Sequence, residues 1–135
     1  TDFCQVTRVN DDRLAANAIE AAEQTERLDI AEIRDFAPLH QVLDAVSDQR
    51  LLIWCDETSA GAVHRNAVTV FAAHEKPSSA AILIGPEGGF SEAEQRLLAA
   101  HKNCLKVSLG PRILRADTAA IAALTCYQSV FGDWA

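Results

Sequence analysis

Two glycine-containing segments carry the residues whose types and spacing could do chemistry. The first is Leu83-Ile84-Gly85-Pro86-Glu87-Gly88-Gly89-Phe90-Ser91, and the second is Leu109-Gly110-Pro111-Arg112-Ile113-Leu114-Arg115. Each is an apolar run that ends in glycine and turns, and a helical pattern follows it. Backbone groups at strand ends are free to bind a ligand, and glycine lets the ligand approach them closely. The two segments therefore predict the two walls of one small-molecule pocket.

Each segment also has a purely structural interpretation. Proline and glycine are common in strand-to-helix turns, and the first segment matches neither a Walker A loop nor a GxGxxG motif. The adjacent glycines after Glu87 exceed what a turn requires, which favours a ligand loop. In the second segment, Arg112 and Arg115 could simply pair with acidic surface residues. Their position around Ile113 and Leu114 also suits polar recognition beside a flat apolar group such as adenine.

The elements that position these segments alternate between strand and helix patterns. Strands are expected over 3–9, 51–55, 80–84 and 105–109, and helices over 10–27, 38–46, from 91 and from 117 or 118. Residues 58–65 have the composition of a loop, and 68–72 fit either a strand or a helix. The capping box Ser91-x-x-Glu94 starts a helix that should turn Leu97 and Leu98 inward. Continuously apolar strands indicate an α/β fold, with a mainly parallel sheet flanked by helices.

Composition limits the classes of function. A chain of 135 residues with 49% hydrophobic residues is expected to form one globular domain. The net charge of −7 argues against broad affinity for nucleic acid. A local RNA site remains possible at the basic residues in and just before the second segment: Lys102, Lys106, Arg112 and Arg115. No apolar run reaches the roughly twenty residues that span a membrane, and no signal peptide is recognisable. Four scattered cysteines and four histidines without ligand spacing predict reduced thiols, a cytoplasmic location and no metal site.

Three motifs together resemble a known family. They are Leu-Ile-Gly-Pro-Glu-Gly-Gly-Phe-Ser-x-x-Glu, Leu-Gly-x-Arg-Ile-Leu-Arg-x-x-Thr-Ala and the helix pattern Glu20-Ala21-x-x-Gln24-x-x-Arg27. They closely resemble the bacterial 16S rRNA (uracil-N3)-methyltransferases, the RsmE type of the SPOUT superfamily. Taken alone, the helix pattern could equally be a solvated face with pairs such as Glu23 to Arg27.

The resemblance covers nearly the whole chain and implies both a fold and an activity. The fold would be a SPOUT-type α/β domain with a C-terminal trefoil knot, one of the rare exceptions to the rule against knots. The activity would be methylation of uridine N3 in 16S rRNA of the small ribosomal subunit, with S-adenosylmethionine as cofactor, by a homodimer. Residues 1–135 would form the methyltransferase domain, without its first strand and helix and without the family's N-terminal PUA-like RNA-binding domain.

The same resemblance assigns individual site residues. The expected cofactor-binding residues are Leu83, Gly85, Glu87, Gly88 and Gly89 on one wall and Ser108, Leu109, Gly110, Ile113 and Leu114 on the other. Arg115 is the expected catalytic residue, through stabilising charge on a uracil oxygen or positioning a target phosphate. The family has Thr and Glu where this chain has Ala116 and Asp117, which removes a hydroxyl and shortens a carboxylate near the substrate.

Three alternatives stay open at this point. One is another SPOUT methyltransferase, acting on tRNA or on a ribose 2′-oxygen. The second is a cofactor-binding or dimerisation module that lacks activity. The third is a generic phosphate- or nucleotide-binding α/β domain, which is disfavoured because this sequence contains no matching phosphate-binding motif.

Overall fold

A computed structural model describes residues 1–4, 10–57 and 65–134 of the chain. The chain divides into two compact units, one of Gln5–Pro38 and one that joins Thr1–Cys4 to Leu39–Ala135. The smaller unit contains helix α1 (Asp11–Gln24), which is capped as expected because the Asn10 side chain accepts a hydrogen bond from the Arg13 N–H.

Helix α1 ends earlier than the sequence pattern predicts. Glu26 takes a φ of 55°, in the left-handed region that terminates helices. Arg27 therefore lies beyond the helix and pairs with Asp29 at 2.9 Å, whereas the sequence pattern predicts a pair with Glu23.

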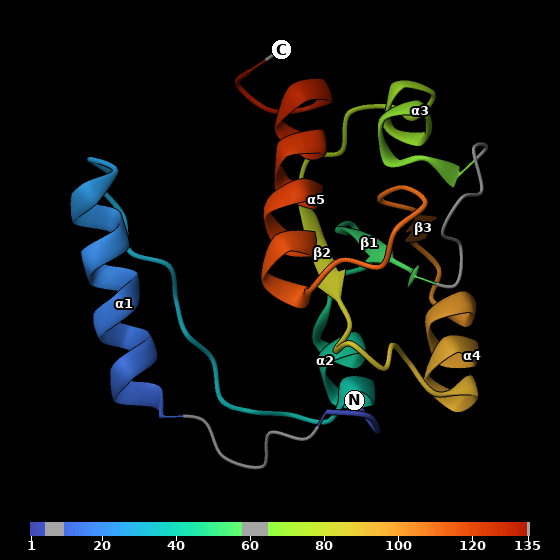
Figure 1. The fold of residues 1–135 in the computed structure, drawn as a ribbon, viewed down its shortest axis with the longest axis horizontal. Helices are drawn as coiled ribbons and strands as arrows, with labels where there is room; N and C mark the ends of the chain where they lie inside the picture. The colour runs from blue at the N-terminus through green and yellow to red at the C-terminus, as the bar shows by residue number, and fades with distance from the viewer. Residues whose placement is uncertain (5–9, 58–64, 135) are drawn as a thin grey trace. The chain divides into compact units, whose positions relative to one another are not determined.

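The larger unit is built on a three-stranded parallel sheet (Figure 1). Strand β1 (Leu51–Cys55) lies in the centre, with β2 (Ala80–Ile84) on one side and β3 (Cys104–Val107) on the other. In this register Trp54 of β1 lies opposite Leu83 of β2 and Lys106 of β3. Since all three strands run in the same direction, their carboxyl ends meet at one edge of the sheet, and the predicted parallel α/β sheet is confirmed.

Side chains of β1 alternate between two hydrophobic cores, so the whole strand is buried. Leu51, Ile53 and Cys55 face the core that contains α3 (Ala67–Ala72) and α5 (Ala116–Val130). In that core Phe71 lies 6.2 Å from Tyr127 between ring centroids, at a steep angle that favours aromatic contact.

The opposite face of the sheet carries the second core. Leu52 and Trp54 pack there with Leu43 of α2 (Leu39–Ala45) and Leu98 of α4 (Glu92–Ala100). Helices therefore cover both faces of the sheet, which is the layer arrangement expected for buried parallel strands.

The capping box at the start of α4 is confirmed. Ser91 and Glu94 exchange side-chain-to-backbone hydrogen bonds, and the Asp2 N–H donates to Glu94 Oε1 at 2.9 Å. Ser91 Oγ also donates to Asp2 Oδ2 at 2.6 Å, which ties residues 1–4 to this helix. Leu98 is completely buried, but the prediction for Leu97 is wrong: it is 47% exposed, because it lies on the outer side of α4.

Other sequence expectations need correction at the element ends. The ambiguous segment 68–72 is helical, since Asn66 caps α3 through its side chain. Strand β3 begins at Cys104 and ends at Val107, two residues before the predicted end. Helix α5 has Arg115 as its N-cap without a side-chain bond, so the expected cap by Asp117 or Thr118 is wrong; Asp117 accepts from the Thr118 N–H inside the helix.

Parts of two expected segments lie outside the described residues, namely 5–9 of the first strand and 58–64 of the loop. The C-terminal trefoil knot stays a prediction. Across residues 1–4, 10–57 and 65–134, no helix is long and apolar enough to cross a membrane.

Candidate functional site

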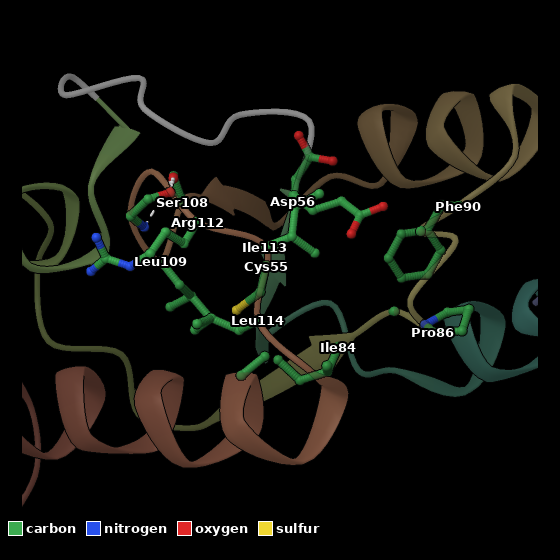
Figure 2. A pocket seen from close by; sticks show the side chains of 15 residues that line it. Cys55, Asp56, Ile84, Pro86, Phe90, Ser108, Leu109, Arg112, Ile113 and Leu114 are labelled. Atoms are coloured by element: carbon green, nitrogen blue, oxygen red, sulfur yellow. Dashed lines mark hydrogen bonds between the residues drawn. The ribbon is translucent and has the colours of Figure 1, made fainter.

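A pocket lies at the carboxyl edge of the sheet, where the three strands end (Figure 2). The hollow contains about 510 Å³ of space free of protein atoms, a volume that includes solvent at its open mouth. Its lining comes from the last residues of β1 and β2, from the segment after each strand and from one residue of α5: Cys55, Asp56, Glu57, Ile84, Gly85, Pro86, Gly89, Phe90, Ser108, Leu109, Gly110, Arg112, Ile113, Leu114 and Ala119.

The end of β1 contributes a buried ion pair to the pocket wall. The Asp56 side chain is 3% exposed, and its Oδ2 lies 2.8 Å from Lys106 Nζ on the neighbouring strand β3. The Asp56 N–H donates to the Val107 carbonyl, and Lys106 Nζ lies 4.2 Å from the centre of the Trp54 ring. Lys106 thus compensates the buried carboxylate and packs its charge over an aromatic face.

Glu57 follows on the same wall and is half-buried. Burial raises the pKa of its carboxyl group, and the nearby charges of Asp56 and Glu87 raise this pKa further. The carboxylate lies close to Gly89, because a Cβ added at Gly89 would be 2.6 Å from Glu57 Oε1. Glu57 therefore reaches from the end of β1 to the loop that follows β2.

The loop after β2 is a tight turn held in place by an aromatic anchor. The Gly89 N–H donates to the Pro86 carbonyl at 2.8 Å, and Gly89 takes a φ of 69°, which glycine adopts without strain. Phe90 packs edge-on against Trp54 with ring centroids 5.9 Å apart. A Cβ at Gly85 would be 2.8 Å from the Phe90 ring, so glycine is required for this packing.

The loop after β3 forms the opposite wall. Ser108 is 2% exposed; its N–H donates to the Arg65 carbonyl, and its own carbonyl accepts from the Ala67 N–H. Gly110 has a φ of 118°, and a Cβ there would have no heavy atom within 4 Å. Figure 2 shows Arg112 beside Ser108 on this side, with Phe90 at the other end of the hollow.

The thiol of Cys55 lies in the pocket wall but has low nucleophilic reactivity. Burial raises its pKa to about 12, so it stays protonated near neutral pH and is a poor nucleophile. In the ranges that the structure describes, no three His, Cys, Asp or Glu side chains gather to hold a metal ion. The pocket can offer a ligand apolar side chains, strand-end backbone groups, two carboxylates and one guanidinium.

The structure brings most of the predicted cofactor residues together. Those that line the pocket are Gly85, Gly89, Ser108, Leu109, Gly110, Ile113 and Leu114. Leu83 packs instead against the second core, and Glu87 and Gly88 lie in the turn without lining the pocket. Arg115 is exposed at the start of α5, where its Nε lies 3.7 Å from Asp117 Oδ1.

Sequence reasoning missed the contribution of β1, chiefly Asp56 and Glu57. The signal was present, because both follow an apolar strand, and the carboxyl ends of parallel strands share an edge. Arg112, whose place in the second segment suits polar recognition of a ligand, lines the pocket.

Comparison with known proteins gives a consistent result. Residues 1–128 match the family described as RNA methyltransferase domain. The chain is 37% identical over 124 residues to ribosomal RNA small subunit methyltransferase E of Rickettsia conorii, covering 92% of this chain and 49% of that protein. It is 34% identical over 115 residues to the Bacillus subtilis protein of the same name, covering 83% of this chain and 44% of that one. The chain thus spans about half the length of these relatives.

Two solved structures share the fold. A Legionella pneumophila protein in complex with the bound cofactor SAM superposes with a TM-score of 0.70 at 34% identity, over 96% of this chain and 52% of that one. A ribosomal RNA small subunit methyltransferase E from Neisseria gonorrhoeae bound to S-adenosyl methionine gives a TM-score of 0.76 at 25% identity, over 97% and 54% of the respective chains.

Proposed function

The chain belongs to the RNA methyltransferase family of the RsmE type, and from this premise we propose that it uses S-adenosylmethionine to methylate N3 of a uridine in 16S rRNA. One observation carries the proposal: both motif loops meet in a single pocket at the carboxyl edge of the sheet. Proteins of this fold from Legionella pneumophila and Neisseria gonorrhoeae were solved with that cofactor bound, which supports the assignment.

The residues of the pocket fit this cofactor. Ile84, Leu109, Ile113 and Leu114 offer the apolar surface that an adenine ring needs. Gly110 leaves open space where a side chain would stand, so a ligand can approach the backbone of the second loop. Carboxylates at one end and Arg112 at the other complement a molecule that carries both cationic and anionic groups.

Bound S-adenosylmethionine supplies an electrophilic methyl group on a positively charged sulfur. The part of this chain is then mainly positional, because most of the rate gain in such a transfer comes from holding the attacking nitrogen in line with the methyl group. The two loops suit this role since Phe90 and Ser108 anchor them to buried parts of the fold. N3 of neutral uracil carries a proton, which must pass to solvent or to another base as the N3–methyl bond forms and the sulfur–methyl bond breaks. Arg115, exposed at the start of α5, would stabilise the charge that this loss leaves on a uracil oxygen, or would position a phosphate.

The RNA itself would have to present an unstacked base. N3 of uracil takes part in base pairing, so a target uridine within a helix must be splayed out before it enters the pocket. The net charge of −7 indicates that this chain alone binds RNA weakly. We propose that the main RNA contacts come from an additional RNA-binding domain, and that the active form is a homodimer.

The test is calorimetric titration with S-adenosylmethionine, followed by methylation of small-subunit RNA and mass spectrometry of its nucleosides. Saturable binding near one site per chain together with 3-methyluridine supports the proposal. Methylation of tRNA or of a ribose would instead indicate another SPOUT activity. Cofactor binding without any methylation, persisting when the additional RNA-binding domain is restored, would indicate a binding module.

Arg115→Ala tests the residue-level part of the mechanism. We expect turnover to fall by about 100-fold or more, the scale of losing one electrostatic contact to the transition state, while cofactor affinity is retained. Arg34→Ala is the matched control, because Arg34 is equally exposed and pairs with Glu32 far from the motif loops in sequence. Unchanged turnover of Arg115→Ala with bound RNA would show that the role assigned to Arg115 is wrong.

A further inference from the structure

Glu57 is the one pocket-lining carboxylate whose charge is left without a cationic partner among the described residues. Asp56 beside it is matched by Lys106 at 2.8 Å. Arg112, the cation of the pocket lining, belongs to the other wall and is largely exposed. Glu57 and Arg112 therefore lie on different walls of the pocket, and neither neutralises the other.

The position of the Glu57 carboxylate is restricted by the loop it touches. The 2.6 Å between Oε1 and the site of a Gly89 Cβ shows that the carboxylate lies against the loop at Gly89, where an added Cβ would displace it. The pKa of the Glu57 carboxyl group is raised by burial and by the nearby charges of Asp56 and Glu87. A carboxylate in a locally negative, partly desolvated site gains free energy when a cation binds next to it.

The proposed cofactor carries two cations, an α-ammonium that remains in the product and a sulfonium that exists only before the reaction. The sulfur of S-adenosylmethionine is a positively charged sulfonium, and the sulfur of the product S-adenosylhomocysteine is a neutral thioether. The two molecules otherwise share the same adenosine and amino acid groups. A carboxylate beside the sulfur therefore distinguishes the two molecules by charge, whereas a carboxylate beside the α-ammonium does not.

We propose that Glu57 is a specificity-determining residue, whose carboxylate favours the sulfonium of S-adenosylmethionine over the neutral sulfur of S-adenosylhomocysteine. This inference rests on the proposed function, since it assumes that the pocket holds that cofactor. It assigns to Glu57 the task of promoting exchange of spent product for fresh methyl donor. The motif loops alone contain no unpaired carboxylate in the pocket lining that could do this.

The experiment measures three dissociation constants by calorimetry, for S-adenosylmethionine, S-adenosylhomocysteine and sinefungin, in the wild-type chain and in Glu57→Gln. Sinefungin carries an ammonium group in place of the sulfonium and so reports charge separately from the methyl group. We expect Glu57→Gln to weaken S-adenosylmethionine and sinefungin about tenfold and to change S-adenosylhomocysteine less than about twofold. Glu57→Asp retains the charge and should restore part of the preference.

Glu92→Gln is the matched control, because Glu92 is an exposed carboxylate of α4 that pairs only loosely with Arg96, at 3.7 Å. It should leave all three constants within about twofold of the wild type. A second measurement needs no variant: the wild-type preference for the cationic ligands should shrink as salt is raised from 50 mM to 500 mM.

The outcomes separate this inference from the proposed function. If the wild type binds all three ligands but Glu57→Gln weakens them equally, or weakens none, the role of Glu57 is refuted and the cofactor assignment stands. If the wild type shows no saturable binding of S-adenosylmethionine or S-adenosylhomocysteine, both fail together. A salt-independent preference for the cationic ligands would also contradict an electrostatic role for Glu57.

Discussion

The ion pair between Lys106 and Asp56 holds the end of β1 at the pocket, and its loss should be costly. Lys106→Met removes the ammonium group that lies over the Trp54 ring and keeps an unbranched apolar side chain. The Asp56 side chain is 3% exposed, and removing one partner of a fully buried pair costs about 3–5 kcal/mol. Because Lys106 is 27% exposed, water reduces the expected loss to about 2–3 kcal/mol.

A double-mutant cycle in urea unfolding isolates this interaction. Asp56→Asn and Lys106→Met are measured singly and together, and we expect a coupling free energy of about 1–3 kcal/mol. The contact of Lys106 with Trp54 is lost in both backgrounds, so it cancels from the cycle. A coupling below about 0.5 kcal/mol would refute the reasoning, because it would show that Lys106 does not compensate the buried charge of Asp56.

Three further predictions concern the same unit. Gly110→Ala should weaken S-adenosylmethionine binding in calorimetry, because its Cβ enters the open space through which the ligand is proposed to approach the second loop; unchanged affinity would contradict this. Gly89→Ala and Gly110→Ala should each cost about 1–2 kcal/mol of backbone strain, because both glycines have a positive φ. Ser91→Ala should lower the free energy of unfolding by about 1 kcal/mol through loss of the helix cap, with a change below 0.3 kcal/mol as the contrary result. Cys55 should resist alkylation at pH 8, because burial raises its pKa to about 12. The unfolded thiol ionises near pH 9 while the folded thiol stays neutral, so the free energy of unfolding should fall as the pH rises from about 9 to 12. A free energy of unfolding that is constant over this range would contradict the prediction.

The sheet could be predicted because its strands are apolar enough to be buried on both faces. Leu51–Cys55 and Ala80–Ile84 have the predicted bounds, since nothing in those runs suits an exposed face. Local side-chain caps were equally readable, as Ser91 and Asn10 show. The start of α5 could not be predicted in this way, because its N-cap Arg115 forms no side-chain hydrogen bond and so gives no local sequence signal.

The site was predictable as far as it is made of consecutive residues. The two motif loops carry their own glycine signature, and most of their assigned residues line the pocket. Glu57 and Asp56 carry no such signature, because their place in the pocket depends on β1 lying between β2 and β3. The order of strands in a sheet is a property of the whole packing, which no local pattern encodes. Leu83 shows the same limit, since strand alternation places it in the opposite core.

The strand order also determines when β1 can form its hydrogen bonds during synthesis of the chain. β1 is the central strand, yet both of its hydrogen-bonding partners come later in the sequence. During translation, this five-residue apolar strand leaves the ribosome with two unpaired edges, and neither can be filled until β2 and then β3 have emerged. We therefore expect ribosome-associated chaperones to bind the nascent chain at Leu51–Cys55. When these chaperones are depleted, we expect misfolding to begin at this segment.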